Sequence, residues 1–257
     1  MSENELLLIE QAQGVMAITL NRPKVNAFNK ELILALREAL KQAEHDARVR
    51  CIQIGGAGRV FSGGQDLGEF LQGGISYREH LLHTYNPLIL QLRALEKPIL
   101  AAINGPVSGA ALGVVLACDL RIASDQARFV VGFNGIGLAP DSAVSLLLPA
   151  LIGLGRATEF TFTNASISAE QALAWGLVTR VVPTDELGQQ ANAWAVELAR
   201  GPLRAMGLTK RAFNKAVLRN LSEVLDYEAH IQEVARQSSE HQEGVSAFLE
   251  KRPPKYI

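Results

Sequence analysis

Two glycine-rich segments have the composition of turns that expose backbone N–H groups. The first covers residues 55–70 (GGAGRVFSGGQDLGEF) and follows a strand-like run; the second covers residues 104–113 (NGPVSGAALG) and follows the apolar run 99–103. A helix that begins with almost no side-chain bulk lets a ligand approach its unpaired N–H groups and the positive end of its dipole. If the two turns meet, each can supply one N–H to the same carbonyl oxygen, which would form an oxyanion hole.

Glycine-rich turns also bind phosphate groups, so nucleotide binding is the first alternative. Residues 56–61 lack the last glycine of a dinucleotide-binding fingerprint, and the chain contains no Gly-Lys-Ser/Thr sequence of a P-loop. The residues around Ser108 do not match the Gly-x-Ser-x-Gly elbow of a serine hydrolase. The motifs therefore favour chemistry at a carbonyl group over nucleotide binding or serine-based hydrolysis.

Asp141 is the candidate acid–base residue. It follows Pro140 and precedes the apolar residues 144–151, which predict a helix. Two interpretations fit these residues: an ordinary acidic residue at a helix start, or a carboxyl group whose apolar surroundings raise its pKa and suit it to proton transfer. The residues alone leave both open.

The elements that must position these groups alternate between strands and helices. Residues 6–10 and 15–20 are strand-like, residues 29–31 open an amphipathic helix, and strand, glycine turn and helix then recur. This pattern predicts an α/β fold of repeated ββα units. We expect residues 1–184 to form the core with the site, and residues 185–257 to form a C-terminal helical region of the same structural unit.

Composition excludes several classes of partner and site. With 25 basic and 26 acidic residues the net charge is −1, which suggests neither nucleic acid nor a membrane surface as partner. Cys51 and Cys118 lie in apolar runs and resemble core residues, while His80 and His83 fit a solvated helix face better than a metal pair. Because no signal peptide or transmembrane run is visible, we expect a cytoplasmic protein. The spacing of the five histidines predicts no metal site.

Seven blocks resemble the crotonase (enoyl-CoA hydratase/isomerase) superfamily over essentially the whole length. Within it, the segments GQDL, YNPL and EGVSAFLEKRP are most similar to the branch of 1,2-epoxyphenylacetyl-CoA and enoyl-CoA isomerases, which act in phenylacetate and fatty acid metabolism. The blocks are NRP (21–23), NAF (26–28), FSGGQDL (61–67), residues 97–119, GLAPD (137–141), ALAWGLVTRVVP (172–183) and EGVSAF (243–248).

The resemblance implies a crotonase spiral whose C-terminal helices pack in a homotrimer or a dimer of trimers. It implies an acyl-CoA thioester as substrate, with no cofactor beyond the coenzyme A that belongs to the substrate. The backbone N–H groups of Gln65 and Ala110 would form the oxyanion hole, and Asp141 matches the acidic residue of isomerase and dehalogenase members.

The resemblance also assigns residues to the two ends of the substrate. Phe248 and Lys251 match positions that a neighbouring subunit supplies, with Lys251 directed toward a phosphate. The other implied coenzyme A contacts are Val25, Asn26, Ala27, Gly63, Asp66 and Leu67, and the implied acyl-pocket residues are Tyr85, Phe133 and Leu138.

Two departures from the family pattern shape the expected activity. The two glutamates with which hydratases hold water are replaced by Gly113 and Phe133, so we expect an isomerase that moves a 3-enoyl double bond to the 2-position or isomerises a ring epoxide. Ala143 and Val144 replace two glycines, which we expect to narrow or reshape the acyl pocket. The alternatives are a hydratase-like enzyme, a hydrolytic or dehalogenating enzyme with Asp141 as nucleophile, and a non-catalytic CoA-binding protein.

Overall fold

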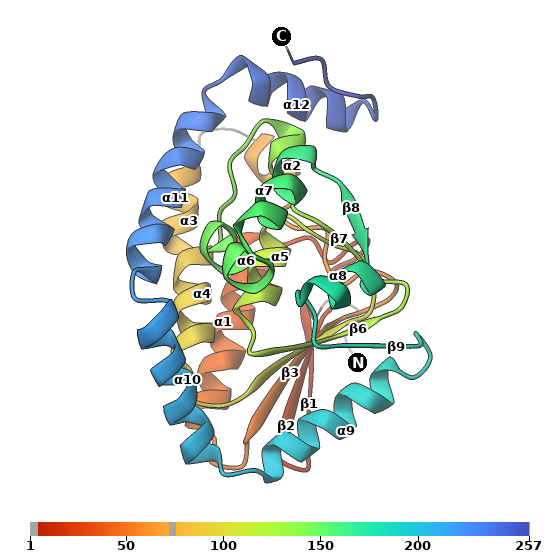
Figure 1. Cartoon of the computed structure of the whole chain (residues 1–257), viewed down its shortest axis with the longest axis vertical. Coiled ribbons are helices and arrows are strands. Elements are labelled where there is room, and N and C mark those ends of the chain that lie inside the picture. The colour runs from red at the N-terminus through yellow and green to blue at the C-terminus, as the bar shows by residue number, and fades with distance from the viewer. Residues whose placement is uncertain (1–4, 72–75, 257) are drawn as a thin grey trace.

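A six-stranded sheet forms the centre of the fold (Figure 1). The computed structural model describes residues 5–71 and 76–256. The strand order is β1-β2-β3-β4-β6-β9, in which β1 and β2 are antiparallel and the other neighbours are parallel. The strands are β1 Leu7–Ala12, β2 Val15–Leu20, β3 Cys51–Gly56, β4 Ile99–Ile103, β6 Leu120–Ser124 and β9 Arg180–Val182.

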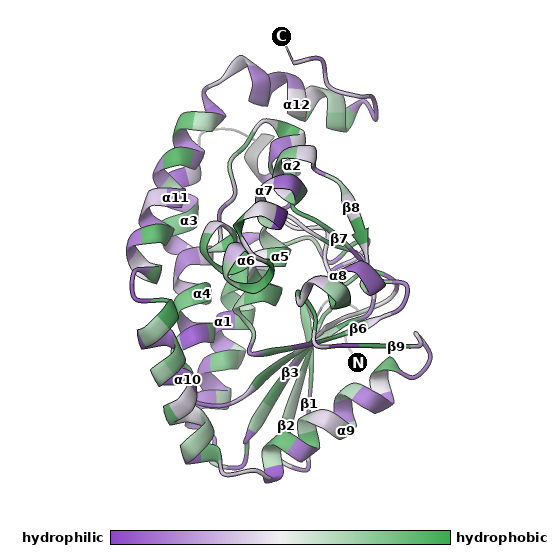
Figure 2. Ribbon diagram, in the orientation of Figure 1, coloured by the Kyte–Doolittle hydropathy of each residue, from purple (hydrophilic) through white to green (hydrophobic). Residues whose placement is uncertain are grey.

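Both faces of this sheet are covered. Cys51 and Leu100 belong to one buried apolar cluster and Ile52 and Ile99 to another, so side chains alternate between two cores along the strands. A sheet buried on both faces needs nearly continuous apolar strands, and Figure 2 shows the central strands mostly green. The predicted α/β fold is confirmed.

A second, three-stranded sheet lies beside the helical part of the molecule. β5 pairs in parallel with β7, and β7 pairs antiparallel with β8. An isolated bridge between Ser62 and Val107 connects this sheet to the first glycine turn. These strands are β5 Val107–Ser108, β7 Arg128–Val130 and β8 Ser166–Ser168.

The helices predicted from residues 29–31 and over residues 144–151 are present as α1 and α6. The backbone of Thr84 leaves the helical region, so α3 and α4 are separate helices. The helices before the second sheet's last strand are α1 Lys30–His45, α2 Leu67–Leu71, α3 Tyr77–His83, α4 Tyr85–Ala94, α5 Ala110–Ala117, the 3-10 turn η1 Asn134–Ile136, α6 Val144–Ile152 and α7 Leu154–Thr163.

The C-terminal helices contribute to the fold of the single chain. α9 lies on the sheet, where its Trp194 and Ala195 complete one of the two cores, and α11 packs along α3 and α4. α12 crosses the end of the molecule beside η1 (Figure 1). These helices are α8 Ala169–Trp175, α9 Leu187–Arg200, α10 Leu203–Val217, α11 Leu221–Arg236 and α12 Ser239–Leu249.

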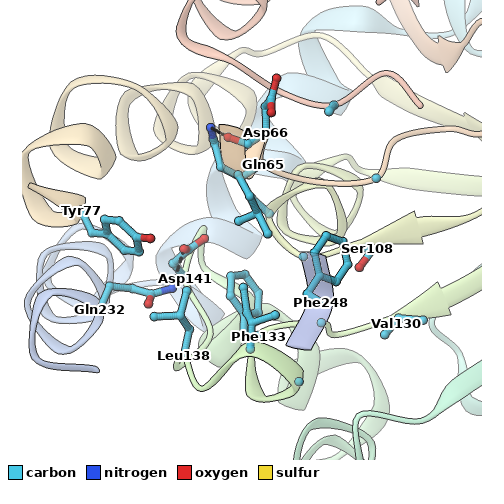
Figure 3. Close-up of a pocket in the computed structure, with 18 of the residues that line it drawn as sticks. Gln65, Asp66, Tyr77, Ser108, Val130, Phe133, Leu138, Asp141, Gln232 and Phe248 are labelled. Carbon is cyan, nitrogen blue, oxygen red and sulfur yellow. Dashed lines mark hydrogen bonds between the residues drawn. The ribbon is translucent and has the colours of Figure 1, made fainter. Parts of the chain in front are cut away.

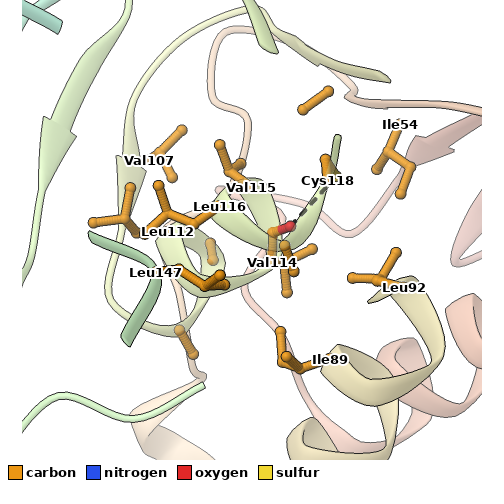
Figure 4. Close-up of a cluster of buried hydrophobic side chains, with 14 of the residues drawn as sticks. Ile54, Ile89, Leu92, Val107, Leu112, Val114, Val115, Leu116, Cys118 and Leu147 are labelled. Carbon is orange, nitrogen blue, oxygen red and sulfur yellow. Dashed lines mark hydrogen bonds between the residues drawn. The ribbon is translucent and has the colours of Figure 1, made fainter. Parts of the chain in front are cut away.

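α5 is buried along its whole length, as its composition predicts. Every residue from Ala110 to Ala117 is inaccessible to solvent or nearly so. Val114, Val115 and Leu116 lie among apolar side chains from the sheet and from α4 and α6 (Figure 4). The helix that carries the second glycine turn is therefore fixed by packing on every side.

Asp119 joins three segments at the C-terminal end of α5. Its carboxylate accepts hydrogen bonds from Arg93 at 3.1 Å, from the buried Lys210 at 2.9 Å and from the N–H of Ile99 at 2.9 Å. The contacts connect α4, α10 and the start of β4. Because Lys210 is buried, removing the negative charge of Asp119 would leave the Lys210 ammonium group unpaired in an environment that does not solvate it.

We expect Asp119→Asn to lower the free energy of unfolding by about 2–3 kcal/mol, somewhat less than for a fully buried pair because Asp119 is partly exposed. The matched control is Asp226→Asn, which breaks the exposed ion pair between Arg78 and Asp226, whose nitrogen and oxygen are 2.9 Å apart. This control should change the free energy of unfolding by less than about 0.5 kcal/mol. Denaturant titration measures both. Equal effects of the two substitutions would contradict the importance of the Asp119 contacts.

Candidate active site

A mainly apolar cavity of about 510 Å³ opens beside the carboxyl ends of β3 and β4 (Figure 3). β3 and β4 pair in parallel with Gly55 opposite Ala102, so the two glycine turns leave the sheet at the same edge. Ligands of parallel α/β sheets bind at this edge. Of the residues implied by the resemblance, those that line the cavity are Val25, Ala27, Gly63, Gln65, Asp66, Leu67, Tyr85, Ala110, Phe133, Leu138, Asp141 and Phe248.

The two glycine turns touch each other. Gly64 and Gly109 both have left-handed backbones, with φ of +89° and +59°. A Cβ atom on Gly64 would lie 2.6 Å from the carbonyl oxygen of Ser108, so only glycine permits this approach. The turns therefore meet as the sequence predicts, and their backbones line one wall of the cavity.

The N–H groups of Gln65 and Ala110 are available at this junction. Phe28 donates to the carbonyl of Gly64 and accepts from the N–H of Asp66, which leaves the intervening N–H of Gln65 on the other side of the chain. Ala110 is the first residue of α5, and no side chain caps that helix end. Its N–H therefore lacks an intrahelical acceptor and carries the positive end of the helix dipole.

The side chain of Gln65 is held by two cavity residues. Its Oε1 accepts a hydrogen bond from the Tyr85 hydroxyl at 2.8 Å and lies 3.2 Å from Nε2 of His80. Burial lowers the pKa of His80, which corrects the expectation of a solvated histidine on a helix face. Tyr85 thus lines the cavity, and its hydroxyl helps to position Gln65, whose backbone N–H lies in the first glycine turn.

Asp141 lies in the cavity wall and is only 8% exposed. Burial raises the pKa of its carboxyl group to about 6, although hydrogen bonds from Ser142 and Gln232 act in the opposite direction. Ser142 Oγ donates to Oδ1 and Gln232 Nε2 donates to Oδ2, each at 2.7 Å. A carboxyl group with a pKa near neutrality can exchange protons readily. This environment therefore favours proton transfer as the role of Asp141 over that of an ordinary acidic residue at a helix start.

The side chain of Asp141 does not cap the helix that follows it. α6 begins at Val144, whose N–H donates to the backbone carbonyl of Asp141 at 3.0 Å. The N–H groups of Ala143 and Ser145 donate to Glu228 of α11 at 2.8 and 3.0 Å. Burial raises the pKa of Glu228 to about 7. Glu228 does not line the cavity; it supports the turn behind it.

The expectation that Ala143 and Val144 narrow the acyl pocket is wrong. Both side chains are buried in the main core, and neither lines the cavity. Ala143 has a left-handed backbone with φ of +63°, a conformation that favours glycine. The substitutions therefore affect the backbone of the turn and the core behind it, not the space available to an acyl group.

Gly113 and Phe133, at the positions of the hydratase glutamates, have different surroundings. A Cβ on Gly113 would lie 2.4 Å from the carbonyl oxygen and 2.6 Å from the Cβ of Ser142, so Ser142 fills the space that a side chain there would need. Phe133 is buried and presents its ring to the cavity (Figure 3). Neither position offers a polar group for water.

Asn26 and Lys251 lie apart from the cavity. Asn26 is buried with a left-handed backbone, and its side chain donates to the carbonyls of Ala57 and Val60, a structural role that sequence reasoning missed. Lys251 is exposed and absent from the cavity lining. Asp66 does line the cavity, but its carboxylate is paired with Arg22 at 2.6 Å.

Phe248 lies at the cavity of its own chain, although the resemblance implied a neighbouring subunit. α12 carries Phe248 and Leu249 to the cavity, and both side chains are exposed in the single chain. His241, on the same helix, contacts the carbonyl of Ile136 at 2.8 Å and the Tyr77 hydroxyl at 3.1 Å. These contacts attach α12 to η1 and α3.

Sequence reasoning also missed the polar residues that α11 contributes. Glu228 and Gln232 are four residues apart and therefore lie on one face of that helix. Both are buried on a face that otherwise carries Leu225 and Ala229. Two large polar residues on the apolar stripe of a helix were the signal that could have indicated their role, because buried polar groups need partners.

Within residues 5–71 and 76–256, no cluster of three or more His, Cys, Asp or Glu side chains could hold a metal ion. No helix in these two ranges is long and apolar enough to cross a membrane.

The comparison with known proteins agrees with this geometry. The chain is 40% identical to the 1,2-epoxyphenylacetyl-CoA isomerase of Escherichia coli K12, with 98% of each chain covered. It is 37% identical to the 4-chlorobenzoyl coenzyme A dehalogenase-2 of an Arthrobacter species, over 86% of this chain and 82% of that protein. A probable enoyl-CoA hydratase of Rhodobacter capsulatus is 39% identical over 96% of both chains.

Solved structures lead to the same assignment. An enoyl-CoA hydratase from Mycobacterium avium subsp. paratuberculosis K-10 superimposes with a TM-score of 0.89 at 35% identity, covering 98% of this chain and 99% of that chain. The expected crotonase-type fold is thus confirmed. The sequence profile of the enoyl-CoA hydratase/isomerase family matches residues 10–257, and the chain therefore belongs to this family of acyl-CoA enzymes.

Proposed function

We propose that the protein is an acyl-CoA isomerase that moves a double bond from the 3- to the 2-position, with Asp141 as the proton shuttle. The observation that carries this proposal is that, among the residues the structure describes, the cavity lining has one buried carboxyl group, that of Asp141, next to a junction of two free backbone N–H groups. Asp66, the other acid of the lining, is paired with Arg22. One carboxyl group is sufficient to carry one proton between two carbons.

In the proposed reaction the thioester oxygen accepts hydrogen bonds from the N–H groups of Gln65 and Ala110. Asp141 removes a proton from C2, and the electron pair of that C–H bond forms the C1–C2 double bond of a dienolate as negative charge moves to the thioester oxygen, while the C3–C4 double bond stays in place. The two N–H groups and the dipole of α5 stabilise that charge. Asp141 then returns the proton to C4. The C3–C4 pair takes up the proton, the C1–C2 pair becomes the new C2–C3 double bond, the carbonyl reforms, and the product is the 2-enoyl thioester.

The surroundings of Gly113 and Phe133 support isomerisation over hydration. Hydration needs a water molecule that is oriented and deprotonated beside C3, and the family uses two glutamates for this task. Here Ser142 occupies the space next to Gly113, and Phe133 presents an apolar ring to the cavity. We therefore expect that the 2-enoyl product leaves without being hydrated.

A ring-epoxide substrate is the second candidate. It is supported by the 40% identity to the 1,2-epoxyphenylacetyl-CoA isomerase and by aromatic side chains in the cavity lining. Dehalogenation with Asp141 as nucleophile is supported by the 37% identity to the chlorobenzoyl-CoA dehalogenase. Assays of one preparation with 3-hexenoyl-CoA, 1,2-epoxyphenylacetyl-CoA and 4-chlorobenzoyl-CoA distinguish the three reactions.

We further propose that the chain associates as a homotrimer or a dimer of trimers. The support is a set of large apolar side chains that are exposed on α10 and α11 of the single chain, among them Phe213, Val217, Tyr227 and Val234. Light scattering coupled to size-exclusion chromatography gives the mass of the assembly. A monomer at micromolar concentration would contradict this proposal.

Asp141→Asn should reduce the conversion of 3-hexenoyl-CoA by about 10²-fold or more, because the amide cannot accept the C2 proton. The ultraviolet absorbance of the conjugated 2-enoyl thioester follows the reaction. Asp185→Asn, at an exposed turn before α9, is the control and should retain full activity. Wild-type turnover without any loss in Asp141→Asn would overturn the role of Asp141.

The same substitution should stabilise the protein at pH 8. A carboxyl group whose folded pKa is raised binds more protons when folded, so its ionisation destabilises the fold as pH rises from about 4 to 6. Removing the charge should then raise the free energy of unfolding by about 2–3 kcal/mol at pH 8 and by much less at pH 4. Denaturant titrations at both pH values test this, and a variant destabilised at pH 8 would contradict it.

The pH dependence of kcat/KM should follow the ionisation of Asp141. Since the base is the carboxylate, activity should rise with pH through about 6 and level off above it. With an exposed aspartate as the base, this rise in kcat/KM, the acidic limb of the profile, would be centred near pH 4. Initial rates between pH 4.5 and 8.5 at low substrate concentration measure the limb, and a profile that is flat down to pH 4.5 would exclude a buried base.

A further inference from the structure

Gln232 of α11 is completely buried at the wall of the cavity and contacts the carboxyl group of Asp141. Its Nε2 donates to Oδ2 of Asp141 at 2.7 Å, while its own Oε1 is buried and has no hydrogen-bond partner among the described residues. Figure 3 shows the amide of Gln232 directed at Asp141. A buried carbonyl oxygen without a partner is unusual in a folded protein and calls for an explanation.

The contacts of Asp141, as they stand, suit its ionised state. Ser142 and Gln232 both donate to the carboxyl group, which suits a carboxylate, since a carboxylate can only accept. A protonated Asp141 has an O–H that needs an acceptor. A half-turn of the Gln232 amide exchanges Nε2 and Oε1 and presents the unpartnered oxygen to that O–H.

The two orientations of the amide are otherwise balanced. As it stands, Nε2 is bonded and Oε1 is not. After a half-turn with Asp141 protonated, Oε1 would accept from Asp141 and Nε2 would take the place of the unpartnered oxygen. The protonation state of Asp141 then favours one orientation over the other.

We propose that Gln232 is a positioning residue that holds Asp141 as a carboxylate and reverses its amide when Asp141 takes up the substrate proton. This inference rests on the proposed function only in that it assigns the proton transfer to Asp141. Because a hydrogen bond to a charged group is stronger than one to a neutral group, the net effect of Gln232 is to favour the ionised form of Asp141.

Other ionisable groups surround Asp141 and remain in place when Gln232 is replaced. Glu228, which lies on α11 with Gln232, and Tyr85 of α4 both interact electrostatically with Asp141. Tyr77 and His80 of α3 line the same cavity. α5, which packs against the Asp141 turn through Gly113, carries no ionisable side chain. A shift caused by replacing Gln232 is therefore due to the lost amide.

The test is the pH dependence of kcat/KM in Gln232→Met, which keeps the length of the side chain and removes both amide atoms. Loss of the donor should move the acidic limb upward by about 1 pH unit. Gln237→Met, on the exposed end of α11, is the matched control and should leave the limb unchanged. Gln232→Glu, in which a second carboxyl group competes for the proton, should also move the limb upward and serves if Gln232→Met does not fold.

A measurement that does not depend on catalysis tests the role of Gln232 separately from the proposed function. The difference in unfolding free energy between each background and its Asp141→Asn form, measured from pH 4 to 9, reports the pKa of Asp141. That pKa should be about 1 unit higher in the Gln232→Met background. An unchanged pKa would overturn the role of Gln232 even if Asp141→Asn is inactive; a shifted pKa with a fully active Asp141→Asn would overturn only the proposed reaction.

Discussion

The contact between the two glycine turns is the constraint on which the rest of the site depends. Gly64 lies against the carbonyl of Ser108 at a distance that excludes any side chain, and parallel pairing of β3 and β4 brings the turns to the same edge of the sheet. Burial of α5 on all sides then fixes the N–H of Ala110 relative to that of Gln65. Donors that are fixed before the substrate arrives need no reorganisation when charge develops on an oxygen between them.

The environment of the Asp141 carboxyl group is unfavourable for folding, and the proposed proton transfer depends on it. Burial raises the pKa of Asp141, and Ser142 and Gln232 limit that rise to a value of about 6. Behind it, Glu228 is a second buried acid, held by the N-terminus of α6 and by the Ser145 hydroxyl. Two buried acids next to one turn destabilise the fold near neutral pH, and the extensive apolar cores on both faces of the sheet offset this.

Local sequence patterns were sufficient for the elements and for part of the site. Period-two runs, glycine turns and the small residues of α5 each contain their own signal, so β2, α5 and both turns were predicted within a residue or two. Local patterns left the role of Asp141 open, and the resemblance to the family favoured an acid–base residue. Gln232 was not predicted, since it reaches Asp141 across 91 residues of chain and nothing near either residue indicates the other. Ala143 was assigned to the pocket because it replaces a glycine of the family pattern, whereas its side chain lies in the main core.

The distance along the chain between Asp141 and Gln232 also has a consequence for how the protein is made. During synthesis both glycine turns and Asp141 emerge long before α11, the helix that carries Glu228 and Gln232. Until α11 docks, Asp141 lacks its contact with Gln232, and the N–H groups of Ala143 and Ser145 lack the acceptor that Glu228 provides. A nascent chain on the ribosome therefore carries Asp141 and both glycine turns before it has the helix that completes their surroundings.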